Sequence, residues 1–280
     1  MSVPIRIGLF AAGLVAVFGA AFLLGDVTDP DSGEGDTATH ADDSHSPELR
    51  APAAGPARIV VDDRRFEPGV SETLAFRVVD RQGLTVEDFD VEHDRRMHVI
   101  AVRRDLTGYQ HVHPRRTGDG GWEVDVAFAE AGPQRVFADF TSKGDPYTLS
   151  GDVEVAGDYE PRPLPAAIES ADTGDYAVAV AKAGTIRRFT VSKNGQPVDD
   201  IEPYLGARGH LVALREGDLA FQHVHPRDEA TEGREISFDV ALPKEGRYRL
   251  FLQFKHDGDV HMAAFTEDVR EGHGEAAHGH

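Results

Sequence analysis

The sequence predicts an all-β protein with two tandem β-sandwich domains, and three observations support this fold class. Short runs rich in Val, Ile, Phe and Thr alternate between apolar and polar residues and are separated by Gly, Pro and Asp, which is typical of strands. No segment beyond the N-terminal 25 residues has the apolar period of a long amphipathic helix. A stretch of about 110 residues occurs twice, and this length fits one sandwich domain rather than one solenoid unit.

An apolar segment near the N-terminus predicts membrane attachment. Residues 7–24 carry no charge, Arg6 precedes them and Asp26 follows them. This run just reaches the length of a membrane span, and a basic residue before it favours a cytoplasmic N-terminus. Because no A-x-A cleavage site follows, we expect residues 1–25 to form an uncleaved signal-anchor, a transmembrane helix; a cleaved signal peptide is the alternative. The protein is therefore expected in the cell membrane as a single-pass protein whose bulk is extracytoplasmic.

The rest of the chain divides by composition. Residues 26–57 are rich in Asp, Ser, Gly, Pro and Ala and have too few apolar residues to fold, so they predict a flexible acidic linker. A second stretch of linker composition, residues 157–171, separates the two copies of the repeat. The predicted sandwich domains are therefore residues 58–157 and residues 158–270, followed by a flexible histidine-containing tail at residues 271–280.

Charge and cysteine content narrow the function. The chain has 29 Lys and Arg residues against 49 Asp and Glu residues, and its formal net charge of -20 argues against nucleic acid as a partner. It has no cysteine, which excludes disulfides, thiolate zinc sites, Cys-based blue-copper centres and a lipobox-type lipid anchor. The 14 histidines are therefore the principal candidates for binding a soft or borderline metal ion.

The internal repeat places the same three histidines in each domain. Residues 98–114 (HVIAVRRDLTGYQHVHP) and residues 210–226 (HLVALREGDLAFQHVHP) are identical at eight of seventeen aligned positions. The matched histidines are His98, His111 and His113 in the first copy and His210, His223 and His225 in the second. Both copies therefore predict the same hairpin, with one histidine at the start of its first strand and two near the end of its second.

The spacing predicts that each triplet lies on one face of its hairpin. His111 and His113 are two residues apart, so on a strand they project from the same face. A turn centred on residues 105–106 places His98 opposite His113 and Ile100 opposite His111. Directly opposed Cβ atoms lie about 5 Å apart and diagonal ones about 7 Å apart, so three imidazoles can converge on one ion through bonds of about 2 Å.

The predicted ligands suit copper, with zinc as the alternative. Neutral histidine is the commonest metal ligand, and three histidines without carboxylate or thiolate fit either ion. We expect one site in each domain, beside that domain's core, because the same face carries apolar residues: Ile100, Val102 and Tyr109 in the first domain and Val212, Leu214 and Phe221 in the second. A structural role is the alternative, in which backbone hydrogen bonds hold the histidines at the edge of the core.

Two further residues are candidate ligands of the second site. His256 and His261 flank a turn near the end of the second domain, and His261 or Met262 would add a ligand if this hairpin lies close to the triplet. A thioether ligand favours Cu(I). Ordinary hairpin surface is the alternative for both residues.

The segment before the second triplet resembles a group of exported proteins. Residues 203–210 read PYLGARGH, and together with HVHP, YRLFLQF and a later DG they are similar to uncharacterised exported bacterial proteins that are common in actinobacteria. The resemblance covers most of the second domain and, more weakly, the first, and it implies an immunoglobulin-like or cupredoxin-like sandwich and a role in metal handling. The first domain has VEHDRRM at residues 91–97 in place of PYLGARG, which puts its site in doubt.

These observations favour one function over two alternatives. We expect a non-enzymatic, membrane-tethered protein that sequesters or delivers copper outside the cytoplasm, with the metal ion and, through the N-terminal helix, the membrane as partners. A metalloenzyme is the second hypothesis, since three histidines with an open fourth position can activate water or oxygen. The third is a structural or adhesion module in which the histidines only support the sandwich.

Overall fold

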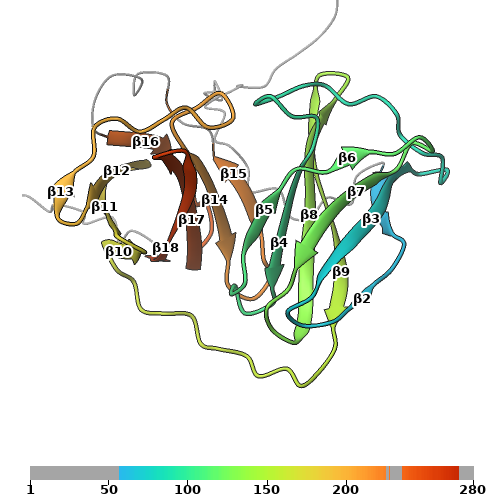
Figure 1. The fold of residues 1–280 in the computed structure, drawn as a ribbon, viewed down its shortest axis with the longest axis horizontal. Coiled ribbons are helices and arrows are strands. Elements are labelled where there is room, and N and C mark those ends of the chain that lie inside the picture. The colour runs from blue at the N-terminus through green and yellow to red at the C-terminus, as the bar shows by residue number, and fades with distance from the viewer. Residues whose placement is uncertain (1–56, 225–226, 228–234, 271–280) are drawn as a thin grey trace, which may run out of the picture. The chain divides into compact units, whose positions relative to one another are not determined.

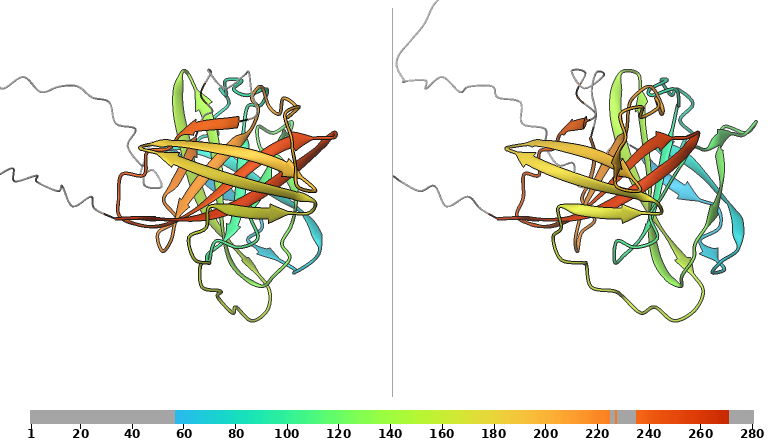
Figure 2. Two further views of the ribbon diagram at one scale, coloured as in Figure 1. Left: turned by 90° about the vertical axis from the view of Figure 1, so that its left-hand side faces the viewer. Right: turned by 60° about the vertical axis from the view of Figure 1, so that its left-hand side comes forward.

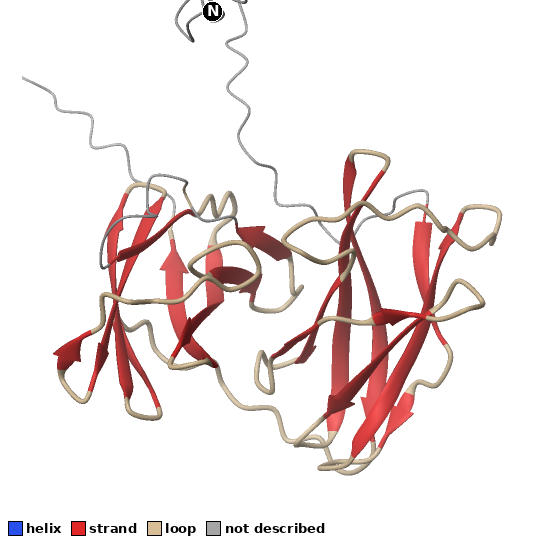
Figure 3. Ribbon diagram, turned by 45° about the horizontal axis from the view of Figure 1, so that its top comes forward, coloured by secondary structure: helices blue, strands red, loops and turns tan. Residues whose placement is uncertain are grey.

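The structure is a computed structural model that describes residues 57–224, 227 and 235–270, except for the side chains of Ala57 and His223. All of these residues belong to one compact unit. Every regular element among them is a strand, drawn red in Figure 3, which confirms the predicted all-β class.

The segments predicted at the two ends of the chain lie outside the described residues. They are the anchor at residues 1–25, the linker as far as residue 56 and the tail at residues 271–280. Within the described part, no helix is long and apolar enough to cross a membrane.

The first repeat is built from two sheets, whose strands are labelled in Figure 1. One sheet has the antiparallel order β1-β3-β7-β6. Its strands are β1 (Ala57–Val61), β3 (Ser71–Asp80), β7 (Trp122–Ala127) and β6 (Arg115–Arg116). The other sheet has the order β2-β9-β8-β4-β5, with only β2 and β9 parallel. Its strands are β2 (Arg65–Phe66), β9 (Asp145–Val155), β8 (Gly132–Ser142), β4 (His98–Arg103) and β5 (Gln110–Val112).

Side chains from both sheets fill the core of the first repeat. In β3 the residues Leu74, Phe76 and Val78 are fully buried and alternate with more exposed residues, because successive side chains of a strand point to opposite faces. Val99 and Ala101 of β4 belong to the same hydrophobic cluster from the other sheet. The two sheets therefore pack as a sandwich, and burying each large side chain stabilises the fold by about 1.5–3 kcal/mol.

The second repeat also has two sheets. One has the order β10-β11-β12-β13, and β16 pairs with β12 as well. Its strands are β10 (Ser170–Thr173), β11 (Tyr176–Ala183), β12 (Ile186–Lys193), β13 (Gln196–Pro197) and β16 (Glu235–Asp239). The other has the order β15-β14-β17-β18 and ends in the long red hairpin of Figure 2. Its strands are β15 (Phe221–Val224), β14 (His210–Arg215), β17 (Gly246–His256) and β18 (Asp259–Val269).

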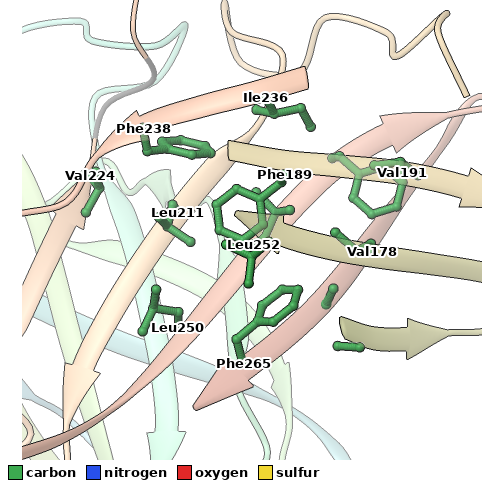
Figure 4. Packing of buried hydrophobic residues seen from close by; sticks show 14 of the residues in the cluster. Val178, Phe189, Val191, Leu211, Val224, Ile236, Phe238, Leu250, Leu252 and Phe265 are labelled. Atoms are coloured by element: carbon green, nitrogen blue, oxygen red, sulfur yellow. The ribbon is translucent and has the colours of Figure 1, made fainter. Parts of the chain in front are cut away.

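The core of the second repeat is again shared by its two sheets. Figure 4 shows Phe189 and Phe238 of one sheet close to Leu211, Leu252 and Phe265 of the other. The ring centre of Phe189 lies 5.9 Å from that of Phe238 and 5.4 Å from that of Phe265. Each repeat thus has its own hydrophobic core.

The two repeats arrange equivalent strands in the same order. The order β5-β4-β8-β9 in the first repeat corresponds to β15-β14-β17-β18 in the second. The strands that begin with His98 and His210 are β4 and β14, and each lies between a short hairpin partner and a long strand. The internal repeat in the sequence is therefore a repeat of structure.

A third hydrophobic cluster combines the two repeats. Its members are Ile100, Val102, Leu106, Phe137 and Leu164 with Val212, Leu214, Leu219, Phe221 and Phe251. The expectation that each histidine triplet adjoins its own domain's core is therefore wrong. In β4 it is Val99 and Ala101 that face the core of the first repeat, and the intervening Ile100 and Val102 face the second repeat.

Two aromatic pairs cross between the repeats in a reciprocal way. Tyr109 stacks on Phe251, with ring centres 4.1 Å apart and ring planes 11° apart. Phe221, the equivalent of Tyr109, stacks on Phe137, the equivalent of Phe251, with ring centres 4.9 Å apart. Each repeat therefore presents the same patch to the other, as in the isologous interface of a two-fold dimer.

Candidate metal centre

The first triplet forms a compact cluster. His98 begins β4, His111 lies in β5 and His113 follows that strand. The register of the hairpin is the one expected from the sequence, with Ile100 opposite His111. One ring nitrogen from each histidine lies within 4.8 Å of the corresponding nitrogens of the other two. The hairpin therefore brings three potential ligand atoms together.

The ring separations in this triad fit a single ion. The ring centres are 5.2 Å apart for His98 and His111, 5.0 Å for His98 and His113, and 4.9 Å for His111 and His113. A metal–imidazole bond is about 2 Å long and the ring centre lies about 1 Å farther out, so two rings on one tetrahedral ion have centres about 5 Å apart. All three separations agree with that value.

A hydrogen bond determines which nitrogen of His111 can bind a metal. His111 Nδ1 lies 2.6 Å from Oε1 of Gln253, an amide oxygen that can only accept a hydrogen bond. Nδ1 therefore carries the proton, and the lone pair is on Nε2, which lies 3.0 Å from Nδ1 of His98. Metal-ligating histidines usually donate their other N–H to an oxygen in this way. Because Gln253 lies in β17, the second repeat orients a histidine of the first.

Burial keeps the third histidine of the triad neutral. The pKa of His113 is lowered to about 4, first by loss of solvation and then by the positive charge of Arg95. At neutral pH the imidazole therefore retains a lone pair for a metal ion. The Nε2 atom of His113 is buried and has no hydrogen-bond partner among the described residues. A buried polar atom without a partner is rare in folded proteins, and coordination of a metal would satisfy it.

The first histidine of the second triplet lies beside this triad. His210 is only 1% exposed, and its ring centre is 6.4 Å from that of His98 and 6.1 Å from that of His111. A further histidine, His93, has its ring centre 5.5 Å from that of His210. The structure therefore places His210 and His93 beside the triad of the first repeat. The separate site in the second domain stays a prediction, because it also depends on His223 and His225.

The rest of the second triplet is described only in part. The backbone of His223 lies opposite Val212, as the sequence predicts from the equivalent pair in the first repeat. The side chain of His223 and the whole of His225 lie outside the described residues. Their predicted role as ligands therefore stays a prediction.

Two segments of the chain match one protein family. A family model described as a domain of unknown function (DUF8832) matches residues 53–157 and residues 172–271. The chain belongs to this family. Each DUF8832 segment contains one histidine triplet, and no curated protein matches the chain.

Solved structures resemble the chain only weakly. Salmonella alpha-2-macroglobulin reacted with methylamine is 16% identical over 78% of this chain and 15% of that chain, with a TM-score of 0.29. The Escherichia coli adhesin FdeC is 12% identical over 78% and 65%, and latent PorU from Porphyromonas gingivalis is 11% identical over 78% and 24%, each with a TM-score of 0.27. The chain spans less than two thirds of the length of each of these proteins. At these scores the likenesses carry no argument about this chain.

The two remaining candidate ligands, His261 and Met262, lie on opposite faces of the β17–β18 hairpin. His261 pairs with Phe254 in the β17–β18 hairpin, and its ring lies 4.2 Å from that of Tyr176 on the side of the second repeat's own core. The neighbouring Met262 points to the opposite face and packs against the cluster between the repeats. It pairs with Gln253, which in turn pairs with His210. The structure therefore brings Met262, and not His261, to the face that carries His210.

Sequence reasoning missed three residues of this face. His93 lies in the VEHDRRM segment, where only the divergence from PYLGARG drew attention. Asp139 lies opposite His98 in β8, and Gln253 lies opposite His210 in β17. The sequence did contain a signal for Asp139 and Gln253. Each lies two residues after an aligned phenylalanine, Phe137 or Phe251, and is a polar residue between apolar neighbours.

This arrangement can hold a metal ion with an open coordination position. Three imidazoles provide suitable ligands for copper or zinc. Within the described part of the chain, this cluster of potential ligands consists of the three histidines and includes no carboxylate. Asp139 is close by on the same face as His98, and its Oδ1 accepts a hydrogen bond of 2.6 Å from Thr148 Oγ1.

Proposed function

We propose that this protein is a membrane-tethered, extracytoplasmic copper-binding protein that sequesters or delivers the ion. One observation carries the proposal: His98, His111 and His113 offer ligand nitrogens within 4.8 Å of one another. The apolar segment at residues 7–24 and the acidic segment after it supply the tether and the spacer in this proposal. The immunoglobulin-like or cupredoxin-like character of the two sandwiches and their limits, residues 58–157 and 158–270, are part of it.

The choice of copper over zinc rests on the charge and chemistry of the site. Cu(I) is monovalent, and the positive Arg95 is close enough to His113 to lower its pKa, so a monovalent ion is repelled less than a divalent one. Imidazole is a good ligand for both metals. Met262 lies on the face that carries His210, and a thioether ligand from it would favour Cu(I).

A metalloenzyme is the second candidate, and Asp139 is the observation that favours it. A carboxylate opposite His98 could take a proton from a metal-bound water. Against this, Asp139 already accepts the hydrogen bond of Thr148, and two of the three histidines of the triad are buried, which suits retention of an ion better than access by a substrate. We therefore propose a binder.

Copper content of the full chain in detergent tests the proposal. The wild type is compared with the triple variant H98Q/H111Q/H113Q and with the control H261Q, after dialysis against a weak chelator. The readout is the difference between proteins, because the terminal segments contain five more histidines: His40, His45, His273, His278 and His280. We expect the triple variant to lose at least one copper ion per chain and H261Q to lose none. Equal copper in all three folded proteins would contradict the proposal.

A further inference from the structure

The histidines of both repeats meet at the interface between them. We infer that His210 of the second repeat and His93 of the first are ligands for a second ion in the same metal centre as the triad, so that one two-ion centre spans the repeats. This inference rests on the proposed function. It goes further because it replaces one site per repeat with a shared centre.

The ring separations divide the five histidines into two groups. Within the triad the centres are 4.9–5.2 Å apart, whereas His98 lies 6.4 Å from both His93 and His210. The centres of His93 and His210 are 5.5 Å apart, again close to the spacing of about 5 Å expected for two rings on one tetrahedral ion. A second ion between His93 and His210 would therefore lie directly beside the ion of the triad.

A hydrogen bond prepares His210 for this role. Its Nε2 lies 3.0 Å from the backbone oxygen of Tyr204, which can only accept a hydrogen bond, so Nε2 carries the proton and Nδ1 the lone pair. This is the same arrangement as the bond between His111 and Gln253, with an N–H to an oxygen on one side of the ring and a lone pair on the other. Both oxygens come from the second repeat.

The backbone at His93 is held in a costly conformation. His93 and Asp94 have φ angles of 49° and 61°, in the left-handed region that L residues rarely adopt. Two backbone hydrogen bonds between Glu92 and Arg95 close this turn. Such a conformation persists where the surrounding structure fixes it, and it is commonest at functional sites.

The corresponding turn of the second repeat lacks the histidine. Leu205 and Gly206 occupy the equivalent positions, with φ angles of 53° and 75°, and Tyr204 and Ala207 close the turn by the same two backbone hydrogen bonds. Leu205 is 8% exposed and offers no ligand atom. The backbone of the turn is therefore a feature of both repeats, and the nitrogen ligand is a feature of the first alone.

The test is electron paramagnetic resonance of the full chain loaded with Cu(I) and then oxidised to Cu(II), with the five terminal histidines replaced by Gln in every protein. The variants are H210Q, H93Q and the control H261Q. Two Cu(II) ions in one centre couple through their magnetic dipoles, which broadens the spectrum and gives a half-field signal. We expect this signal in the wild type and in H261Q, and we expect H210Q and H93Q to lose it together with one copper ion per chain. His93 supplies the decisive variant if burial of His210 makes H210Q unstable, because His93 is half-buried in a turn.

Three outcomes would overturn the inference. A wild type whose copper ions are magnetically isolated has no shared centre, even if it binds two. A half-field signal that persists in folded H93Q and H210Q belongs to other ligands. If only the triple variant H98Q/H111Q/H113Q has less copper than the wild type, the proposed function stands but the second ion does not. If the wild type binds no copper, the proposed function is overturned as well.

Discussion

The two repeats have the same backbone at their interface but different chemistry on it. Tyr109 and Phe251 stack in one direction, and Phe221 and Phe137 stack in the other. The three histidines of each repeat also match, but the polar residues beside them do not. Asp139 of the first repeat corresponds to Gln253 of the second. Apolar packing therefore keeps the two-fold relation, and polar residues beside the matched histidines break it.

The turn before the first histidine of each repeat gives the same contrast. Both turns have two consecutive residues with positive φ, yet one presents His93 and the other buries Leu205. A symmetric scaffold with matched histidine triplets thus carries one further candidate ligand, His93, in the first repeat alone. The comparison predicts that paired mutations at packing positions have equal effects and that paired mutations at polar positions do not.

The largest expected effect is on stability, from removing an interface ring. Phe137→Ala and Phe251→Ala should each lower the free energy of unfolding by about 3–5 kcal/mol, because both side chains are buried and leave a cavity. The two losses should agree within about 1 kcal/mol, since the rings occupy equivalent positions. Urea unfolding measures them, with circular dichroism for the whole chain and fluorescence of Trp122, the single tryptophan, for the first repeat. The exposed Leu84→Ala is the control, with a change below about 0.5 kcal/mol.

The next effect is on metal affinity. Gln253→Leu should weaken copper binding by about 10–100-fold, because His111 loses the oxygen that fixes its tautomer and orientation. Gln134→Leu is the matched control, since Gln134 is also buried but donates a hydrogen bond to the backbone oxygen of its neighbour Gly132 rather than to a histidine. Competition with a chromophoric copper chelator measures both. Equal affinities of the two variants would show that the bond between the repeats does not support the centre.

The pH dependence of the metal-free protein should show a smaller effect. The pKa of His113 is lowered to about 4, so between that pH and about 6.5 the unfolded chain binds a proton that the folded chain does not. Stability from this group is therefore complete above about pH 6.5 and is lost as the pH falls toward 4. Because the ring is partly exposed, we expect a loss of about 1–2 kcal/mol. Thermal unfolding in chelator should show this loss in the wild type and a correspondingly smaller one in His113→Gln; identical pH profiles would contradict the assignment.

The smallest expected effect concerns the two turns. Asp94→Gly gives the first turn the residue that the second has at Gly206, and it should stabilise the protein by up to about 1 kcal/mol by relieving a positive φ. The reverse change, Gly206→Asp, should destabilise it by a similar amount. Thermal melting of both variants measures the pair. A destabilising Asp94→Gly would mean that the first turn depends on its aspartate.

Local features of the fold could be predicted from the sequence. The period-two patterns indicated the strands, and the spacing of the histidines fixed the register that places Ile100 opposite His111 and Val212 opposite His223. These predictions succeeded because strand geometry and hairpin turns depend on neighbouring residues.

The packing between the repeats could not be predicted in the same way. Alternation shows that Ile100 and Val102 are buried on one face, but not whether that face meets its own sandwich or another one. Gln253 lies 142 residues from His111, and its place in the run YRLFLQF does not show which repeat it faces, so only the three-dimensional structure reveals their hydrogen bond. The closeness of His210 to the triad of the first repeat could not be predicted for the same reason.

The reciprocal interface has a consequence for how such a protein can diverge. In a homodimer, every substitution appears twice, so a glutamine on one side of the two-fold axis requires a glutamine on the other. Joining both copies in one chain removes that constraint, because each copy is then encoded separately. Asp139 and Gln253, or His93 and Leu205, are pairs that a homodimer cannot contain. Gene fusion therefore permits an uneven ligand set on an evenly built support.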